Sequence, residues 1–139
     1  MDMYILCMIE DYEQFFEAIK SVISGLLGAK VESKRREDGV DFIDCSILYM
    51  YIECKARNEE LDLSYTEDDY NIKTNTQIYI NIFTHFFSQG ILLIKQLVDK
   101  LNNQLYKSII VEDHSSKAVY IRSGELNCLD ESFWNAVDL

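Results

Sequence analysis

Carboxylates and tyrosines gather in one segment of the chain, and their types and spacing favour contact with a partner. Six carboxylates fall within the eleven residues 59–69, and no Lys or Arg lies between Arg57 and Lys73. Ionised carboxylates attract basic proteins and accept paired hydrogen bonds from Arg, whereas Tyr offers a large contact area with only two torsions to fix. This segment and the strand predicted before it form a candidate partner-binding surface. Its proposed contacts are Tyr49, Tyr51, Asp62, Tyr65, Glu67, Asp68, Asp69 and Tyr70.

The acidic segment has two other interpretations. It can be a solvated loop whose charge keeps the protein soluble, and this alternative stays open. It can also be considered as a calcium loop, but the Asp-x-Asp-x-Asp-Gly pattern of an EF-hand is missing and no Gly lies between Gly39 and Gly90. The calcium interpretation therefore leaves only incidental binding of a divalent cation at residues 67–69.

The rest of the chain contains no motif for catalysis or for a cofactor. Glu112, Asp113 and His114 fall at a predicted hairpin turn, where Asp and His are common for conformational reasons. His85 is interpreted as a structural or capping residue at the start of a helix. The chain lacks GxSxG, HExxH and a glycine-rich phosphate loop, and it has five glycines in all. We therefore expect a non-enzymatic protein with no catalytic residues, no metal and no cofactor.

The cysteines predict free thiols. None of the four forms a CxxC pair or has a zinc-type spacing from a histidine. Most lie in apolar runs, where a reduced Cys behaves as a small hydrophobic residue, so we expect buried thiols in a reducing compartment. The short apolar run 3–9 has no basic stretch before it and predicts neither a signal peptide nor a membrane span, which favours a cytoplasmic location. The cysteines are Cys7, Cys45, Cys54 and Cys128.

Two long amphipathic helices are predicted from apolar residues at helical spacing. The first covers residues 12–27: Asp11 and Gln14 resemble a capping box before it, and Gly28 can adopt the left-handed conformation that ends it. The second runs from about residue 84 to residue 105, and Gly90 inside it is expected to cost about 1 kcal/mol relative to Ala. Residues of these helices expected to face a sheet are Ile19, Ile23, Ile94 and Leu101.

Alternating or short continuous apolar runs predict the strands. They fall within residues 3–9, 29–36, 40–57, 60–65, 77–82, 108–112 and 118–122. We expect 47–57 to form a hairpin with 60–65, 66–75 to be a surface loop, and a short helix to open at Asp130 and bury Phe133 and Trp134. Sequential strands with short reversals favour an antiparallel or mixed sheet. The predicted fold is therefore a single α+β domain over residues 1–139, with a sheet of about six to seven strands and two long helices packed on it.

The charge balance excludes two kinds of partner. The chain has 13 Lys+Arg and 24 Asp+Glu, which gives a net charge of −11. Such a balance argues against general binding of nucleic acid, which needs clustered Lys and Arg, and against docking on an anionic membrane. The one basic cluster, Lys34-Arg35-Arg36, is interpreted as the charged end of a strand. The balance favours a basic protein partner.

In size, acidity, lack of an export signal, α+β order and Tyr/Asp/Glu-rich surface, the whole chain resembles the small immunity proteins of bacterial toxin systems. Among these are the proteins that protect against contact-dependent inhibition toxins. The resemblance implies a cytoplasmic protein that binds one cognate toxin domain, often a basic nuclease, and blocks its active site or substrate entry. The alternatives are an acidic interaction or adaptor domain, a nucleic-acid-mimicking inhibitor, and a small enzyme with a diffuse site.

Overall fold

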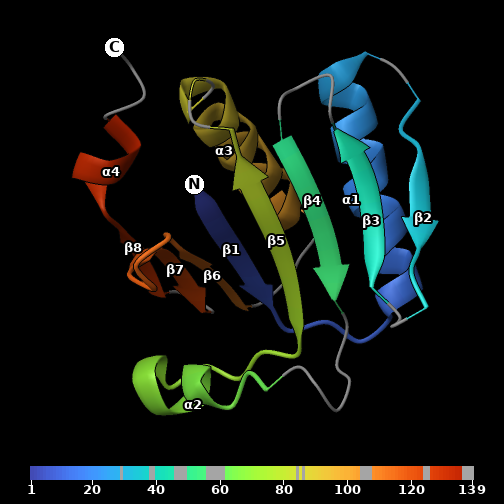
Figure 1. The fold of residues 1–139 in the computed structure, drawn as a ribbon. Coiled ribbons are helices and arrows are strands. Elements are labelled where there is room, and N and C mark those ends of the chain that lie inside the picture. Colours follow the sequence, from blue (N-terminus) through green and yellow to red (C-terminus); the bar gives the residue numbers. More distant parts are fainter. Residues whose placement is uncertain are drawn as a thin grey trace.

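In the described part of the chain, eight strands form one open antiparallel sheet in the order β2-β3-β4-β5-β1-β6-β7-β8 (Figure 1). The computed structural model describes residues 1–28, 30–37, 40–45, 50–55, 62–83, 85, 87–103, 108–123 and 126–135. The strands are β1 (Asp2–Cys7), β2 (Ser33–Arg35), β3 (Asp41–Cys45), β4 (Met50–Lys55), β5 (Thr76–Ile82), β6 (Ser108–Glu112), β7 (Ala118–Ser123) and β8 (Leu126–Leu129). The helices are α1 (Tyr12–Leu27), α2 (Tyr65–Tyr70), α3 (Phe87–Asn103) and α4 (Glu131–Asn135).

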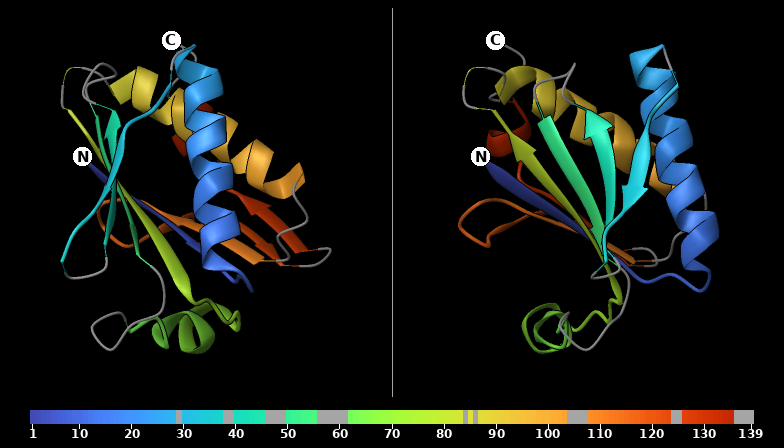
Figure 2. Two further views of the ribbon diagram at one scale, coloured as in Figure 1. Left: turned by 90° about the vertical axis from the view of Figure 1, so that its right-hand side faces the viewer. Right: turned by 45° about the vertical axis from the view of Figure 1, so that its right-hand side comes forward.

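The two long helices lie on the same side of the sheet (Figure 2). Each helix joins two strands that run in the same direction: α1 leads from β1 to β2, and α3 leads from β5 to β6. Crossovers of this kind are right-handed. Because β1 and β5 run in opposite directions and their crossovers lead toward opposite edges, the same hand places both helices on one face. The other face is left without a long helix.

The core fills the space between this helix layer and the sheet. Ile19, Ile23 and Ile94 are fully buried and Leu101 is 1% exposed, so the four residues predicted to face the sheet do so. The strands contribute alternate residues, as the burial of every second residue of β5 shows. Alternation follows from the pleat of a strand, which points successive side chains to opposite faces.

The predicted helix ends are confirmed. The Asp11 carboxylate accepts a hydrogen bond of 3.1 Å from the backbone N–H of Gln14, and Gly28 has a φ of 67°. At the C-terminal helix, the Asp130 carboxylate accepts from the N–H of Phe133, and Trp134 is 3% exposed. Such local caps satisfy backbone groups that the first turn of a helix leaves free.

Three sequence predictions about the strands are wrong. The run 40–57 contains two strands, and β4 pairs with β3 and β5, so the predicted hairpin between 47–57 and 60–65 does not form. Part of the predicted loop 66–75 belongs to α2, which also takes in Tyr65, the end of the predicted strand 60–65. β8 was not expected, and it brings the described sheet to eight strands where six to seven were predicted. The alternation near Leu63 arises because this side chain packs beneath α2 and is buried, outside any strand.

Two of the cysteine side chains are described. Cys7 is a free, fully buried thiol, as predicted, whereas Cys128 is free but exposed on β8. The prediction of burial is therefore wrong for Cys128, because β8 lies at the edge of the sheet. None of the described helices combines the length and the apolar content that crossing a membrane requires.

Candidate functional site

Five neighbouring strands, β3, β4, β5, β1 and β6, can be followed across the sheet in Figure 1, and on the face opposite α1 and α3 they carry a row of side chains. Each residue of the row is the register partner of the next, and paired residues in antiparallel strands project to the same side. We call this side of the sheet the open face. From β3 to β6 the row is Phe42, Glu53, Tyr79, Tyr4 and Glu112.

An aromatic pair lies at the middle of the open face. The rings of Tyr4 and Tyr79 meet edge to face, with centroids 5.4 Å apart. Both side chains are half-buried, so part of each ring is available to a partner. Their strands, β1 and β5, are the two central strands of the sheet, so both rings stand on backbone that is paired on both sides.

A fixed negative charge lies beside this pair. Asp2 Oδ1 accepts hydrogen bonds of 2.7 Å from the Tyr79 hydroxyl and 2.7 Å from Asn81 Nδ2. These two bonds hold the pKa of Asp2 below its usual range, so its carboxylate is ionised at neutral pH. Burial, together with the bond to Asp2, raises the pKa of Tyr79 to about 12. Asp2 is therefore a preorganised acceptor for a cationic group.

One end of the open face is covered by α2. Leu63 and Ile72, which flank this helix, are buried with Leu6 of β1 and Ile110 of β6 in a second apolar cluster. This small core fixes α2 against the sheet and leaves the strand row beyond it uncovered by any other helix in the described part of the chain (Figure 1).

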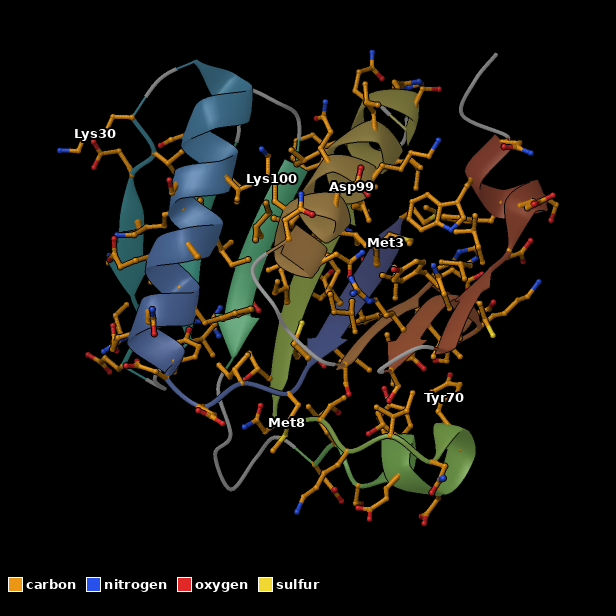
Figure 3. The ribbon with its side chains drawn as sticks, turned by 180° about the vertical axis from the view of Figure 1, so that it is seen from behind. Met3, Met8, Lys30, Tyr70, Asp99 and Lys100 are labelled. Carbon is orange, nitrogen blue, oxygen red and sulfur yellow. The ribbon has the colours of Figure 1, made fainter. Side chains whose placement is uncertain are left out.

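A buried carboxylate ties α2 to the sheet. Glu112 is 4% exposed, and its two oxygens accept hydrogen bonds of 2.5 Å from the Tyr65 hydroxyl and 2.7 Å from the Tyr70 hydroxyl. Burial, and then the bond to Glu112, raises the pKa of both tyrosines above its ordinary value. Figure 3 shows Tyr70 pointing from α2 toward the strands. A buried polar group is stable only when it is hydrogen-bonded, and these two hydroxyls meet that need.

The tyrosines proposed as partner contacts have different positions. Tyr65 and Tyr70 are half-buried and bind Glu112, so their hydroxyls serve the structure and do not point toward a partner. Tyr51 is the register partner of Asn81 in β4 and β5, and its side chain is outside the described residues. Tyr49 lies wholly outside them.

The acidic contacts proposed from the sequence are all exposed. Three of them lie on α2, and the fourth comes just before this helix. The carboxylate before the helix accepts hydrogen bonds from the N–H and the hydroxyl of Ser64, at 3.0 and 2.7 Å, and these bonds lower its pKa. The structure thus places these carboxylates on one small helix and its approach, at the end of the open face. They are Asp62, Glu67, Asp68 and Asp69.

Sequence reasoning missed the residues at the centre of the open face. The polar positions that alternate with the buried isoleucines of β5 were a usable signal for this face, because they mark the side chains that point away from the core. What was lacking was the adjacency of β1 and β5, which are about seventy residues apart in the chain. The missed residues are Asp2, Tyr4, Phe42, Tyr79 and Asn81.

The basic cluster at β2 is engaged in ion pairs. Arg35 Nη2 lies 2.9 Å from Asp41 Oδ2 and 2.7 Å from Glu13 Oε1, and Arg36 pairs with Glu53. These contacts join β2 to β3, β4 and α1. The interpretation of the cluster as the charged end of a strand is therefore confirmed.

The turn between β6 and β7 is organised by a side chain. Asp113 Oδ1 accepts hydrogen bonds from the backbone N–H groups of Ser115 and Lys117, at 2.9 and 3.0 Å, while His114 is exposed. The second histidine, His85, is exposed as well. Among the described residues, no group of three His, Cys, Asp or Glu side chains could hold a metal ion.

A scan against protein-family models found no matching family, and searches of the curated proteins and of the solved structures found no match.

Proposed function

We propose that this protein is a cytoplasmic immunity protein, which binds and neutralises a cognate basic toxin domain through its open face and the carboxylates of α2. The open face carries the proposal: a central sheet surface with an aromatic pair, a fixed carboxylate and neither of the two long helices over it (Figure 1). Interfaces of this kind are built around large, rigid aromatic side chains with polar groups at their border.

The two central tyrosines supply contact area at low cost in entropy. Both rings are held by the sheet and by each other, at a centroid distance of 5.4 Å, so little side-chain freedom remains to be lost on binding. Asp2 is held in the same way by Tyr79 and Asn81 and accepts a guanidinium or ammonium group without rearrangement.

The carboxylates of α2 act at longer range. Exposed charges at the border of an interface accelerate the encounter with an oppositely charged partner and lose this effect as salt rises. The net charge of −11 has the same sign, so the whole molecule attracts a basic partner and α2 directs it to one end of the open face.

The charge test compares two double reversals that change the net charge equally. Asp68→Lys with Asp69→Lys alters α2, and Asp99→Lys with Glu131→Lys alters exposed positions on the helices of the other side, as Figure 3 shows for Asp99. The probe is the toxin domain encoded beside this gene, co-expressed for survival and purified for binding kinetics at two salt concentrations. We expect the α2 variant to associate at least about tenfold more slowly and with a flatter salt dependence, and the control to stay near the wild type.

The contact test uses Tyr4. Tyr4→Ala removes a ring of the central pair and is expected to increase the dissociation rate, whereas Tyr4→Phe keeps the ring and is expected to behave like the wild type. Circular dichroism of both variants verifies folding. Wild-type rates for Tyr4→Ala and for the α2 reversal would place the interface elsewhere. A neighbouring gene that encodes no toxin would remove the support for immunity.

A further inference from the structure

The outer side of β8 offers backbone hydrogen-bonding groups that are not used within the described part of the chain, where β8 pairs only with β7. The N–H of Asp130, the residue after β8, donates to the Val119 carbonyl at 2.9 Å and therefore faces β7. Backbone groups alternate in direction along an antiparallel strand. The N–H and C=O groups of Asn127 and Leu129 consequently face away from β7, at the edge of the sheet.

The two edges of the sheet differ in protection. β2, at one edge, presents exposed Lys34 and Arg35 and has ion pairs to α1. Charged side chains on an edge strand oppose pairing with another strand, because like charges would face each other. β8 reads Leu-Asn-Cys-Leu and carries no charge. Two copies of β8 can therefore pair without repulsion between charged side chains of the two strands.

A cavity and an exposed apolar side chain lie next to each other at this edge. The cavity, of about 590 Å³, lies between α3, β7, β8 and α4, and its lining includes Val98, Asn127, Leu129 and Trp134. Leu129 is 52% exposed, although it lines the cavity. Apolar surface and the unused backbone groups of β8 therefore lie together at this edge of the sheet.

We propose that two copies of this chain pair through β8, antiparallel and around a two-fold axis at Cys128. The two eight-stranded sheets then form one continuous sheet, and the interface is the same patch on both copies. Asn127 of each copy lies opposite Leu129 of the other, and these are the residues whose backbone groups face outward. The proposal does not rest on the proposed function.

The chemistry of β8 fits a second copy. Asn127 lines the cavity, so the Leu129 side chain that the symmetry sets opposite it lies against the cavity of the other copy, away from water. The register of β7 and β8 places Cys128 on the side of Ile121, which belongs to the open face. The two Cys128 side chains thus meet at the axis, and both open faces point the same way.

The solution mass tests the dimer. Sedimentation equilibrium of the full chain is expected to show a dimer whose fraction rises with protein concentration. It is also expected to rise with salt, because the net charge of −11 on each copy repels the other and salt screens this repulsion. The double variant Asn127→Lys with Leu129→Lys is expected to be monomeric. Leu92→Lys, which changes an equally exposed leucine on α3, is the matched control and is expected to remain a dimer.

A thiol crosslink tests the axis. A short bismaleimide, which adds one thiol at each end, is expected to join two wild-type chains covalently through Cys128, whereas Cys128→Ser abolishes the crosslink and keeps the dimer mass. Cys7 is buried and free, so it is not expected to react, and any crosslink through Cys45 or Cys54 would persist in Cys128→Ser. A monomeric mass at every concentration, or a dimer that survives the double Lys variant, would overturn the proposal. Because no toxin is present, its failure leaves the proposed function untouched.

Discussion

Glu112 depends on two hydroxyl groups that come from a helix more than forty residues away in the chain. Removing either donor leaves a buried carboxylate oxygen without its hydrogen bond, which costs about 1–3 kcal/mol. We therefore expect Tyr65→Phe and Tyr70→Phe each to lower the free energy of unfolding by about this amount, as measured by urea denaturation. Tyr4→Phe, whose hydroxyl binds no carboxylate among the described residues, is the control and should change little. Equal effects in all three variants would contradict the role of Glu112.

The same tyrosines predict how stability responds to alkali. Burial and the bond to Glu112 raise the pKa of Tyr65 and Tyr70 above the ordinary value of 10.0, so above that pH the folded protein retains protons that the unfolded chain releases. The stabilisation is complete below about pH 10 and is lost as the pH rises further. The double variant with Phe at both positions should lose less stability between about pH 8 and pH 11 than the wild type does. Equal losses of stability in the wild type and the double variant would show that Tyr65 and Tyr70 do not cause this pH dependence.

At the scale of the elements, the two helical glycines should respond in opposite ways to alanine. The sequence alone predicts that Gly90→Ala stabilises α3, but a Cβ built there lies 2.6 Å from side-chain atoms of Ile82. Nothing lies within 4 Å of a Cβ at Gly25 in α1. We expect Gly25→Ala to raise the free energy of unfolding by about 0.5–1 kcal/mol and Gly90→Ala to lower it by about 1–3 kcal/mol. Thermal denaturation of both variants measures these changes in stability. A more stable Gly90→Ala variant would mean that α3 lies farther from β5.

At the scale of the whole molecule, the two proposals rest on two features of one sheet, its open face and its β8 edge. Two crossovers of the same hand place α1 and α3 on one face and leave the other without a long helix, and the edge strand β8 carries no charged residue. The two proposed associations respond to salt in opposite directions: toxin binding weakens as opposite charges are screened, and self-pairing strengthens as like charges are screened. A salt titration that moves both in the same direction would show that at least one is assigned to the wrong surface.

The sequence by itself determined the parts of this protein that depend on neighbours along the chain. The two long helices, the caps at Asp11, Gly28 and Asp130, and the core positions such as Ile94 follow from a period of 3.6 residues and from local hydrogen bonds. The positions of β1 and β5 could also be predicted, β1 from its short continuous apolar run and β5 from its alternation, which is a local consequence of the pleat.

Only the tertiary structure decided which strands are neighbours, and the candidate site depends on that. The alternating pattern around Leu63 is the same whether this residue packs in a strand or beneath α2. In the same way, the sequence around Tyr70 does not show whether its hydroxyl contacts a partner or a buried carboxylate. The face that neither long helix covers follows from the direction and the hand of two crossovers, which join residues distant in the chain. No local pattern records those pairings, because they are chosen by the free energy of the assembled sheet.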